Sequence, residues 1–137
     1  MNKKRILVVD DEAGVTTMTK LSLEKTSQYE VQVENRSTRA LEAARRFDPD
    51  MILLDITMPE MDGTEVASQI RADPVLKNTP IVFLTAIVSH FETGDSELRR
   101  GNQIFLSKPV SLKTLLECIE QHARKQLEPR GHETALR

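Results

Sequence analysis

Four short apolar runs, each followed by a polar residue, constrain this chain more than any other feature of its sequence. Residues 6–9 precede Asp10 and Asp11, residues 51–54 precede Asp55, residues 81–84 precede Thr85, and residues 104–106 are followed, after one serine, by Lys108. Uninterrupted apolar runs of this length are typical of parallel strands that are buried on both faces. Ligands of such sheets bind beyond the carboxyl ends of the strands. The sequence therefore predicts that these five polar residues share one edge of one sheet.

Helical patterns alternate with the apolar runs. Amphipathic spacing predicts helices over residues 13–25, 38–46 and 65–72 and a last helix that follows Ser111, a candidate N-cap. A further strand is predicted at residues 31–35. This alternation predicts an α/β fold, in which a parallel sheet is covered by helices on both faces.

Composition favours one domain without a nucleic-acid or membrane partner. The chain has 137 residues, which suits a single domain over residues 1–125, and the polar residues 126–137 are expected to form a disordered tail. The net charge of −2 provides no basic surface for nucleic acid or for a membrane. The single cysteine, Cys118, lies among apolar positions and is expected to be a buried, inert thiol. With no apolar stretch of transmembrane or signal-peptide length, these features predict a cytoplasmic setting.

The predicted group of polar residues has the chemistry of a magnesium-dependent phosphoryl site. Carboxylates from two strand ends repel one another, so Asp10, Asp11 and Asp55 need a cation or raised pKa values. Oxygen ligands in a hydrated cleft favour Mg²⁺. Lys108 and Thr85 add an ammonium and a hydroxyl that suit phosphoryl oxygens. Because a carboxylate can itself become an aspartyl phosphate, Asp55, which is followed by a loop rather than a second acid, is the candidate nucleophile.

The order and spacing of these motifs resemble the receiver domain of two-component response regulators, in its single-domain form. The resemblance extends from about Lys4 to Gln121. Its parts are Asp10-Asp11, then Leu53-Leu54-Asp55 with Met58-Pro59 and Met61-Asp62-Gly63, then Leu84-Thr85-Ala86, and last Ser107-Lys108-Pro109. Each part is weak alone, but all four in this order form a specific signature.

The resemblance implies a flavodoxin-like, doubly wound fold with a five-stranded parallel sheet in the order 2-1-3-4-5 and five flanking helices. It implies that Asp55 accepts a phosphoryl group from a phosphohistidine of a sensor histidine kinase or a histidine phosphotransfer protein, and that a conformational change then signals to an unknown output partner protein. Mg²⁺ is expected to be held by Asp11, Asp55 and the backbone carbonyl of Thr57, with Asp10 assisting through water.

The resemblance also implies roles for residues around the acceptor. Lys108 is expected to pair with Asp55 or its phosphoryl group, and the Lys108–Pro109 peptide bond is expected to be cis. Thr85 and Phe105 are expected to form a switch in which Thr85 moves toward the phosphoryl group and Phe105 swings inward behind it. Because Phe105 lacks a phenolic hydroxyl that could hold an outward state, we expect it to sit inward more readily than a tyrosine would.

Simpler explanations and other functions remain open at this level. Asp10 or Asp11 could only cap the following helix, Thr85 could be a turn residue, and Lys108 could be a surface charge. The fold is also compatible with an interaction module that is never phosphorylated. A third function is a small magnesium-dependent phosphatase similar to the haloacid dehalogenase family, although that family wants a second Asp where this chain has Thr57. We do not expect a turnover enzyme.

The sequence departs from the family pattern between Thr85 and Lys108. This segment is polar and carries Gly94 where the fourth helix is expected, so that helix is predicted to be short, shifted or mobile. The histidines show no metal-ligand spacing and are expected at the surface: His90, His122 and His132.

Overall fold

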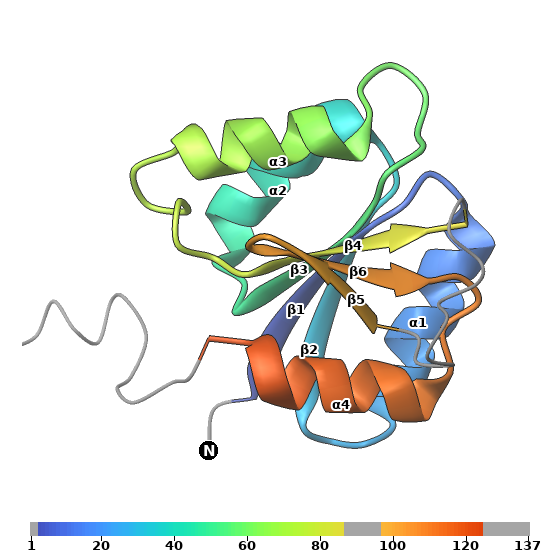
Figure 1. Cartoon of the computed structure of the whole chain (residues 1–137). Helices are drawn as coiled ribbons and strands as arrows, with labels where there is room; N and C mark the ends of the chain where they lie inside the picture. Colours follow the sequence, from blue (N-terminus) through green and yellow to red (C-terminus); the bar gives the residue numbers. More distant parts are fainter. Residues whose placement is uncertain (1–2, 87–96, 125–137) are drawn as a thin grey trace, which may run out of the picture.

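The structure of the protein is a computed structural model that describes residues 3–86 and 97–124 (Figure 1). In these ranges the strands are β1 Lys4–Val9, β2 Tyr29–Glu34, β3 Met51–Asp55, β4 Ile81–Thr85, β5 Glu97–Arg100 and β6 Gln103–Ser107. The helices are α1 Ala13–Glu24, α2 Ala40–Phe47, α3 Gly63–Ala72 and α4 Leu112–His122, and the short 3-10 helix η1, Ser37–Arg39, precedes α2. The expected disordered tail, residues 126–137, lies outside the described residues.

All of the described strands belong to one sheet, in the order β2-β1-β3-β4-β6-β5. The strands β2, β1, β3, β4 and β6 pair in parallel, whereas β5 pairs with β6 in the antiparallel sense. The α/β class and the order of the five predicted parallel strands are therefore confirmed.

The described residues differ from the predicted five strands and five helices. In the described residues there are four α-helices, and part of the segment assigned to the fourth predicted helix is instead β5, a sixth strand at the edge of the sheet. The cause is local. Gly101 and Asn102 connect β5 to β6, and Gly101 has a φ of +61°, a left-handed conformation that glycine adopts without strain. A two-residue connection with glycine at its first position favours a tight hairpin over a helix. Residues 87–96 lie outside the described part of the chain.

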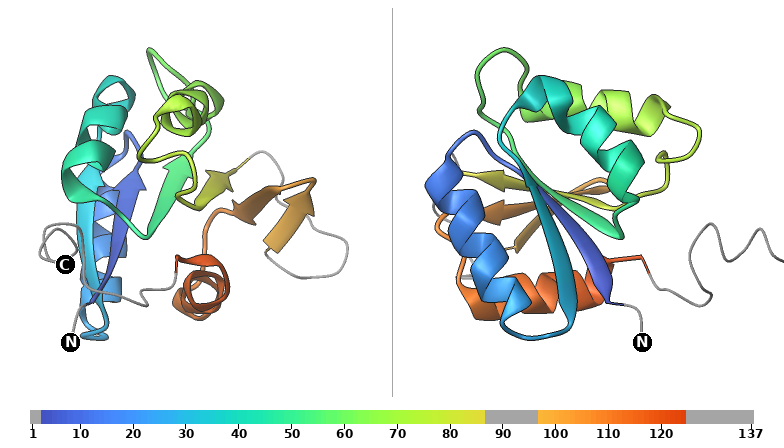
Figure 2. Two further views of the ribbon diagram at one scale, coloured as in Figure 1. Left: turned by 90° about the vertical axis from the view of Figure 1, so that its left-hand side faces the viewer. Right: turned by 180° about the vertical axis from the view of Figure 1, so that it is seen from behind.

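Helices cover both faces of the sheet, as predicted (Figures 1 and 2). α2 and α3 lie on one face, over a core that includes Leu7, Leu54 and Phe83. α1 and α4 lie on the other face, over a core that includes Val8 and Leu53. Successive strand residues point to opposite faces, so the same apolar runs supply both cores and contain no polar residue. No helix within residues 3–86 or 97–124 combines the length and apolar character needed to cross a membrane.

Capping sets the helix that follows the site loop. The side chain of Asp62 accepts a hydrogen bond from the backbone N–H of Glu65 (3.0 Å), and Glu65 Oε1 accepts one from the backbone N–H of Asp62 (3.3 Å). This reciprocal capping box starts α3 at Gly63, two residues earlier than predicted. Ser111 is confirmed as the N-cap of α4, because its Oγ accepts from the backbone N–H of Thr114 (3.1 Å).

Candidate functional site

The carboxyl ends of β1 and β3 bring three carboxylates together. β1 and β3 are paired neighbours, Asp55 is the last residue of β3, and Asp10 and Asp11 follow β1. One carboxylate oxygen from each residue lies within 4.8 Å of the others. Asp10 is fully buried, Asp55 is 5% exposed and Asp11 is exposed. The predicted group of acids is therefore present, with its Asp11 side open to solvent.

Lys108, which follows β6, reaches into these carboxylates. Its Nζ lies 2.7 Å from Oδ2 of Asp10 and 3.1 Å from Oδ1 of Asp55. Its side chain is 19% exposed, so it is not a freely solvated surface charge. The backbone N–H of Lys108 donates to the carbonyl oxygen of Thr85 (2.9 Å), which holds the end of β6 beside β4. The Lys108–Pro109 peptide bond is cis. One ammonium thus joins carboxylates from two different strands.

Two threonines lie at the same end of the sheet. Thr85 is the buried last residue of β4, and the register pairs the preceding Leu84 with Asp55 of β3. Thr57 is exposed in the loop two residues after Asp55. The structure therefore places Thr85 at the edge that carries Asp55, and Thr57 in the loop beyond it.

Burial and charge repulsion act together on Asp55. Desolvation is the largest effect that raises its pKa, followed by the charge of Asp10, and the contacts with Lys108 reduce this rise without cancelling it. Burial is the largest single effect on the pKa of Lys108 and would lower it, but the hydrogen bonds and charges of Asp10 and Asp55 together outweigh burial and raise this pKa. Lys108 therefore stays charged at neutral pH. Three carboxylates against one ammonium leave an excess of negative charge, which suits a hard divalent cation.

Asp10 forms hydrogen bonds both in the turn before α1 and in the acid site. Its Oδ1 accepts a hydrogen bond from the backbone N–H of Glu12 (3.0 Å), at the start of α1, and its Oδ2 accepts from Lys108. Its carbonyl oxygen accepts from the side-chain amide of Asn35 (2.8 Å). The N-cap of α1 is Glu12 and no side chain caps it, so Asp10 orders the turn before the helix instead of capping the helix.

The sequence matches the response regulator receiver domain over residues 6–120. The chain belongs to this family. Chemotaxis protein CheY of Listeria monocytogenes is 36% identical over 124 residues, which cover 88% of this chain and 98% of CheY. The polar-differentiation response regulator DivK of Brucella ovis is 32% identical over 124 residues, which cover 89% of this chain and 97% of DivK.

Solved structures show the same flavodoxin-like receiver fold. Chemotaxis response regulator CheY4 of Vibrio cholerae matches with a TM-score of 0.72 and 28% identity, over 88% of this chain and 98% of that one. The receiver domain of sensor histidine kinase PA1611 from Pseudomonas aeruginosa matches with a TM-score of 0.72 and 28% identity, over 88% of this chain and 97% of that one. That structure has a magnesium ion coordinated in its active-site cleft. Receiver domains are modules of two-component signalling, and the protein has the acidic cluster in which they bind Mg²⁺.

The loop after β3 packs against the backbone of Asp55 at Gly63. The backbone N–H of Gly63 donates to the carbonyl oxygen of Ile56 (2.7 Å). A Cβ on Gly63 would collide with the carbonyl oxygen of Asp55 and would lie 2.8 Å from Cα of Ile56. Both obstacles are backbone, which has no side-chain rotamer to change. The receiver domain therefore requires glycine here so that the loop can close behind the strand that carries Asp55.

We expect Gly63→Ala to lower the free energy of unfolding by about 1–3 kcal/mol, because the backbone that carries Asp55 must shift. Urea unfolding measures this change. Gly14→Ala in α1 is the matched control, since a Cβ there meets no atom within 4 Å, and alanine suits a helix better than glycine. Equal stability of Gly63→Ala and the wild type would contradict the close packing described here.

Phe105 on β6 packs inward against Phe83 on β4. The two residues are register partners, their ring centroids are 5.3 Å apart, and the planes form an angle of 24°. Phe105 is partly buried against the core under α2 and α3. The structure thus places this ring on the sheet face that α2 and α3 cover, in the strand that precedes Lys108.

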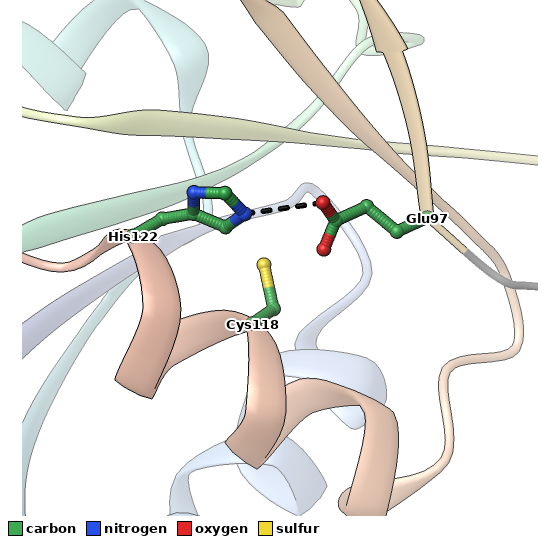
Figure 3. A group of neighbouring side chains, drawn as sticks. All are labelled: Glu97, Cys118 and His122. Atoms are coloured by element: carbon green, nitrogen blue, oxygen red, sulfur yellow. Dashed lines mark hydrogen bonds and ion pairs between the residues drawn. The ribbon is translucent and has the colours of Figure 1, made fainter.

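The surface position predicted for His122 is wrong. Its side chain is only 8% exposed, and its Nε2 lies 3.1 Å from Oε2 of Glu97 on β5 (Figure 3). The thiol of Cys118 lies beside this pair and is buried, as predicted for that residue. The available signal was the four-residue spacing of Cys118 and His122, which puts both on one helix face. It was missed because Glu97 falls in a segment expected to be helical. The other histidines, His90 and His132, lie outside the described residues.

Proposed function

We propose that this receiver domain is a magnesium-dependent phosphoacceptor, in which Asp55 takes a phosphoryl group from a phosphohistidine of a sensor histidine kinase or a histidine phosphotransfer protein. A conformational change then passes the signal to an output partner protein in the cytoplasm. The main support is the position of Lys108 Nζ, 3.1 Å from Asp55 and 2.7 Å from Asp10. A pure interaction module has no need of a half-buried ammonium held between two carboxylates.

The side chains present fit a magnesium ion. We assign Asp11, Asp55 and the backbone carbonyl of Thr57 as ligands, with Asp10 acting through water. This assignment agrees with the hydrogen bonds, because both oxygens of Asp10 already accept from protein groups, whereas Asp11 is exposed. All the donors are hard oxygens, which Mg²⁺ prefers. Bound Mg²⁺ would neutralise the carboxylates and the charge on the oxygens of the transferred phosphoryl group.

The proposed transfer forms a bond between an Asp55 oxygen and phosphorus and breaks the phosphorus–nitrogen bond of phosphohistidine, whose nitrogen keeps the electron pair. Lys108 would turn one of its hydrogen bonds to a phosphoryl oxygen, and the Thr85 hydroxyl would donate another. Water then attacks the phosphorus, the bond to the Asp55 oxygen breaks, and inorganic phosphate leaves while the Asp55 carboxylate is restored. The domain thus catalyses changes of its own state rather than turnover of a small substrate.

The surface next to the site suits a protein donor. A cavity of about 570 Å³ lies between α1 and the segment after β6, and its walls include Val15, Met18, Lys108 and Pro109. Met18 is 62% exposed, and Leu21 one turn further along α1 is also exposed. Apolar side chains at the rim of a polar site give a partner protein area to bury while it presents its phosphohistidine.

Labelling with acetyl phosphate tests the proposal without a kinase. With Mg²⁺ present, we expect one phosphoryl group per chain, located on Asp55 and released by hydroxylamine as an acyl phosphate should be. Chelation of Mg²⁺ should prevent labelling. Mass spectrometry of the intact chain and of its peptides measures both. Absence of label with Mg²⁺ would favour the interaction module, and sustained turnover of a small phosphate ester would favour the phosphatase.

The proposed switch predicts a specific effect of Phe105→Tyr. A phenolic hydroxyl offers a hydrogen bond to an outward rotamer, so the unphosphorylated variant should populate that rotamer more than Phe105 does. Ring NMR signals and their nuclear Overhauser contacts with Phe83 measure the two populations. Phe83→Tyr is the control for an added hydroxyl, because Phe83 is almost fully buried on the same sheet face. Unchanged populations in Phe105→Tyr would remove the idea.

A further inference from the structure

Three potential metal ligands meet at the edge of the sheet, in a group that shares no residue with the acid site. Cys118 and His122 lie one turn apart on α4, and Glu97 is the first residue of β5. One donor atom from each of the three lies within 4.8 Å of the others. Figure 3 shows the sulfur of Cys118 pointing toward the gap between the imidazole and the carboxylate. Helix and hairpin therefore present their donors to one common point.

The donor types select the class of cation. Thiolate and imidazole are ligands of zinc and related transition metals, whereas Mg²⁺ takes oxygen. Zinc sites with three protein ligands commonly keep a fourth position for water. We propose that Glu97, Cys118 and His122 form a second cation site of this receiver domain, one that binds Zn²⁺ with an open fourth position.

The distances in the group are near those that the ion needs. Ligand atoms around a tetrahedral zinc ion are separated by about 3.3–3.6 Å. His122 Nε2 and Glu97 Oε2 are already 3.1 Å apart. The metal would replace the hydrogen bond between these two atoms and bind the Cys118 sulfur, which lies within 4.8 Å of both. Side-chain rotation suffices for that, because all three side chains already point to the same place.

The three side chains differ in exposure, and two of them are accessible to solvent. Cys118 is buried at the base, while the side chains of His122 and Glu97 are 8% and 20% exposed. His122 also lines a cavity of about 640 Å³ between the β5–β6 turn and the start of β4, together with Arg100, Gly101 and Ile81. This cavity brings solvent to one of the three donors, His122, and the partly exposed side chain of Glu97 leaves a second donor accessible.

The protonated thiol of Cys118 limits the affinity of the site for Zn²⁺. In the metal-free protein, burial and then the charge of Glu97 raise the pKa of Cys118 to about 12. The ion must displace this proton when it binds, so the site should bind more weakly than one with an already ionised thiol. Its positive charge offsets the repulsion from Glu97 that disfavours the thiolate. A bound ion would also tie the β5–β6 hairpin, which carries Phe105, to α4.

Cobalt titration of the full chain tests the site, because Co²⁺ reports thiolate ligation through a sulfur-to-metal charge-transfer band. Mg²⁺ in large excess keeps the acid site occupied. We expect one equivalent of Co²⁺ to produce the band and Zn²⁺ to abolish it by displacement. The same titration of Asp55→Asn should give the same band, so failure of the phosphoacceptor proposal leaves this result unaffected.

Variants decide which residues hold the ion. Cys118→Ser should lose the band, and Glu97→Gln and His122→Asn should weaken Co²⁺ binding by at least about tenfold. Glu117→Gln, an exposed acid on the same helix, and His132→Asn are the matched controls and should bind as the wild type does. Absence of a thiolate band in the wild type would overturn the proposal and leave Glu97–His122 as an ordinary ion pair. A weaker band in His132→Asn than in His122→Asn would overturn it as well.

Discussion

Asp55→Asn is expected to abolish phosphorylation of this receiver domain and, at the same time, to stabilise its folded state without metal. Loss of labelling follows because an amide oxygen is too weak a nucleophile to take the phosphoryl group. The gain in stability follows from the electrostatics. Burial and the charge of Asp10 raise the pKa of Asp55 despite its contacts with Lys108. The ionised carboxylate is therefore disfavoured in the folded state, and a neutral side chain of the same shape removes that cost.

The pH dependence fixes the sign of this effect. The folded-state pKa of Asp55 lies above its ordinary value of 3.8. The protonated group therefore favours the folded state below the ordinary value, and this contribution is lost as pH rises through the folded-state pKa. The variant should be more stable than the wild type at pH 7, and the difference should vanish below the ordinary pKa of about 3.8, where both side chains are neutral.

Chemical unfolding at several pH values, in EDTA and in Mg²⁺, measures the effect of Asp55→Asn. Mg²⁺ should stabilise the wild type and much less the variant, because the ion binds the folded carboxylates. Asp62→Asn is the matched control. The pKa of Asp62 is lowered by its bonds with Thr64 and Glu65, so neutralising Asp62 should lower stability and leave phosphorylation intact. Lower stability of Asp55→Asn than of the wild type in EDTA would contradict the electrostatic account.

Apolar runs carried most of the fold prediction because burial on both faces of a parallel strand leaves a direct trace in the sequence. Leu53 and Leu54 pack into opposite cores, and the next residue, Asp55, ends the strand and belongs to the site. The convergence of Asp10, Asp55 and Lys108 followed from the geometry of parallel strands, in which all carboxyl ends meet at one edge. Periodicity and strand ends were sufficient for these residues.

The features that the sequence did not predict, β5 and the burial of His122, depend on contacts between distant segments. The four residues of β5 are too few to show the periodicity of a helix or of a strand. Their pairing depends on β6 and on the tight turn at Gly101. The partial burial of His122 likewise depends on Glu97, 25 residues away, which only the hairpin brings to α4. The local sequence pattern does not predict an edge strand whose hydrogen bonds depend on tertiary context.

Lys108→Ala is expected to destabilise the metal-free receiver domain by about 2–4 kcal/mol, and Mg²⁺ should restore most of that loss. Removing the ammonium leaves the fully buried carboxylate of Asp10 without its partner at 2.7 Å, and breaking a buried pair in this way is costly. The hydrogen bond from the backbone of Glu12 to Asp10 remains and keeps the loss at the lower end of that class. Mg²⁺ supplies the missing positive charge, and it no longer competes with an ammonium for the carboxylates, so it should bind more tightly than it binds the wild type.

Unfolding in EDTA and in Mg²⁺ tests Lys108→Ala, with Lys4→Ala as the control for loss of a lysine. Lys4 Nζ lies 3.5 Å from an exposed Glu120, a surface pair worth less than about 1 kcal/mol, and its removal should give no response to Mg²⁺ beyond that of the wild type.

The rate of phosphorylation separates a role in charge balance from a role in binding the phosphoryl group. If Lys108 also binds the phosphoryl group, Mg²⁺ should restore the stability of Lys108→Ala, but labelling of Asp55 should stay slower than in the wild type. Full recovery of both stability and labelling would mean that Lys108 only balances charge, and an equal response to Mg²⁺ in Lys108→Ala and the wild type would mean that its ammonium and the metal do not share the same carboxylates.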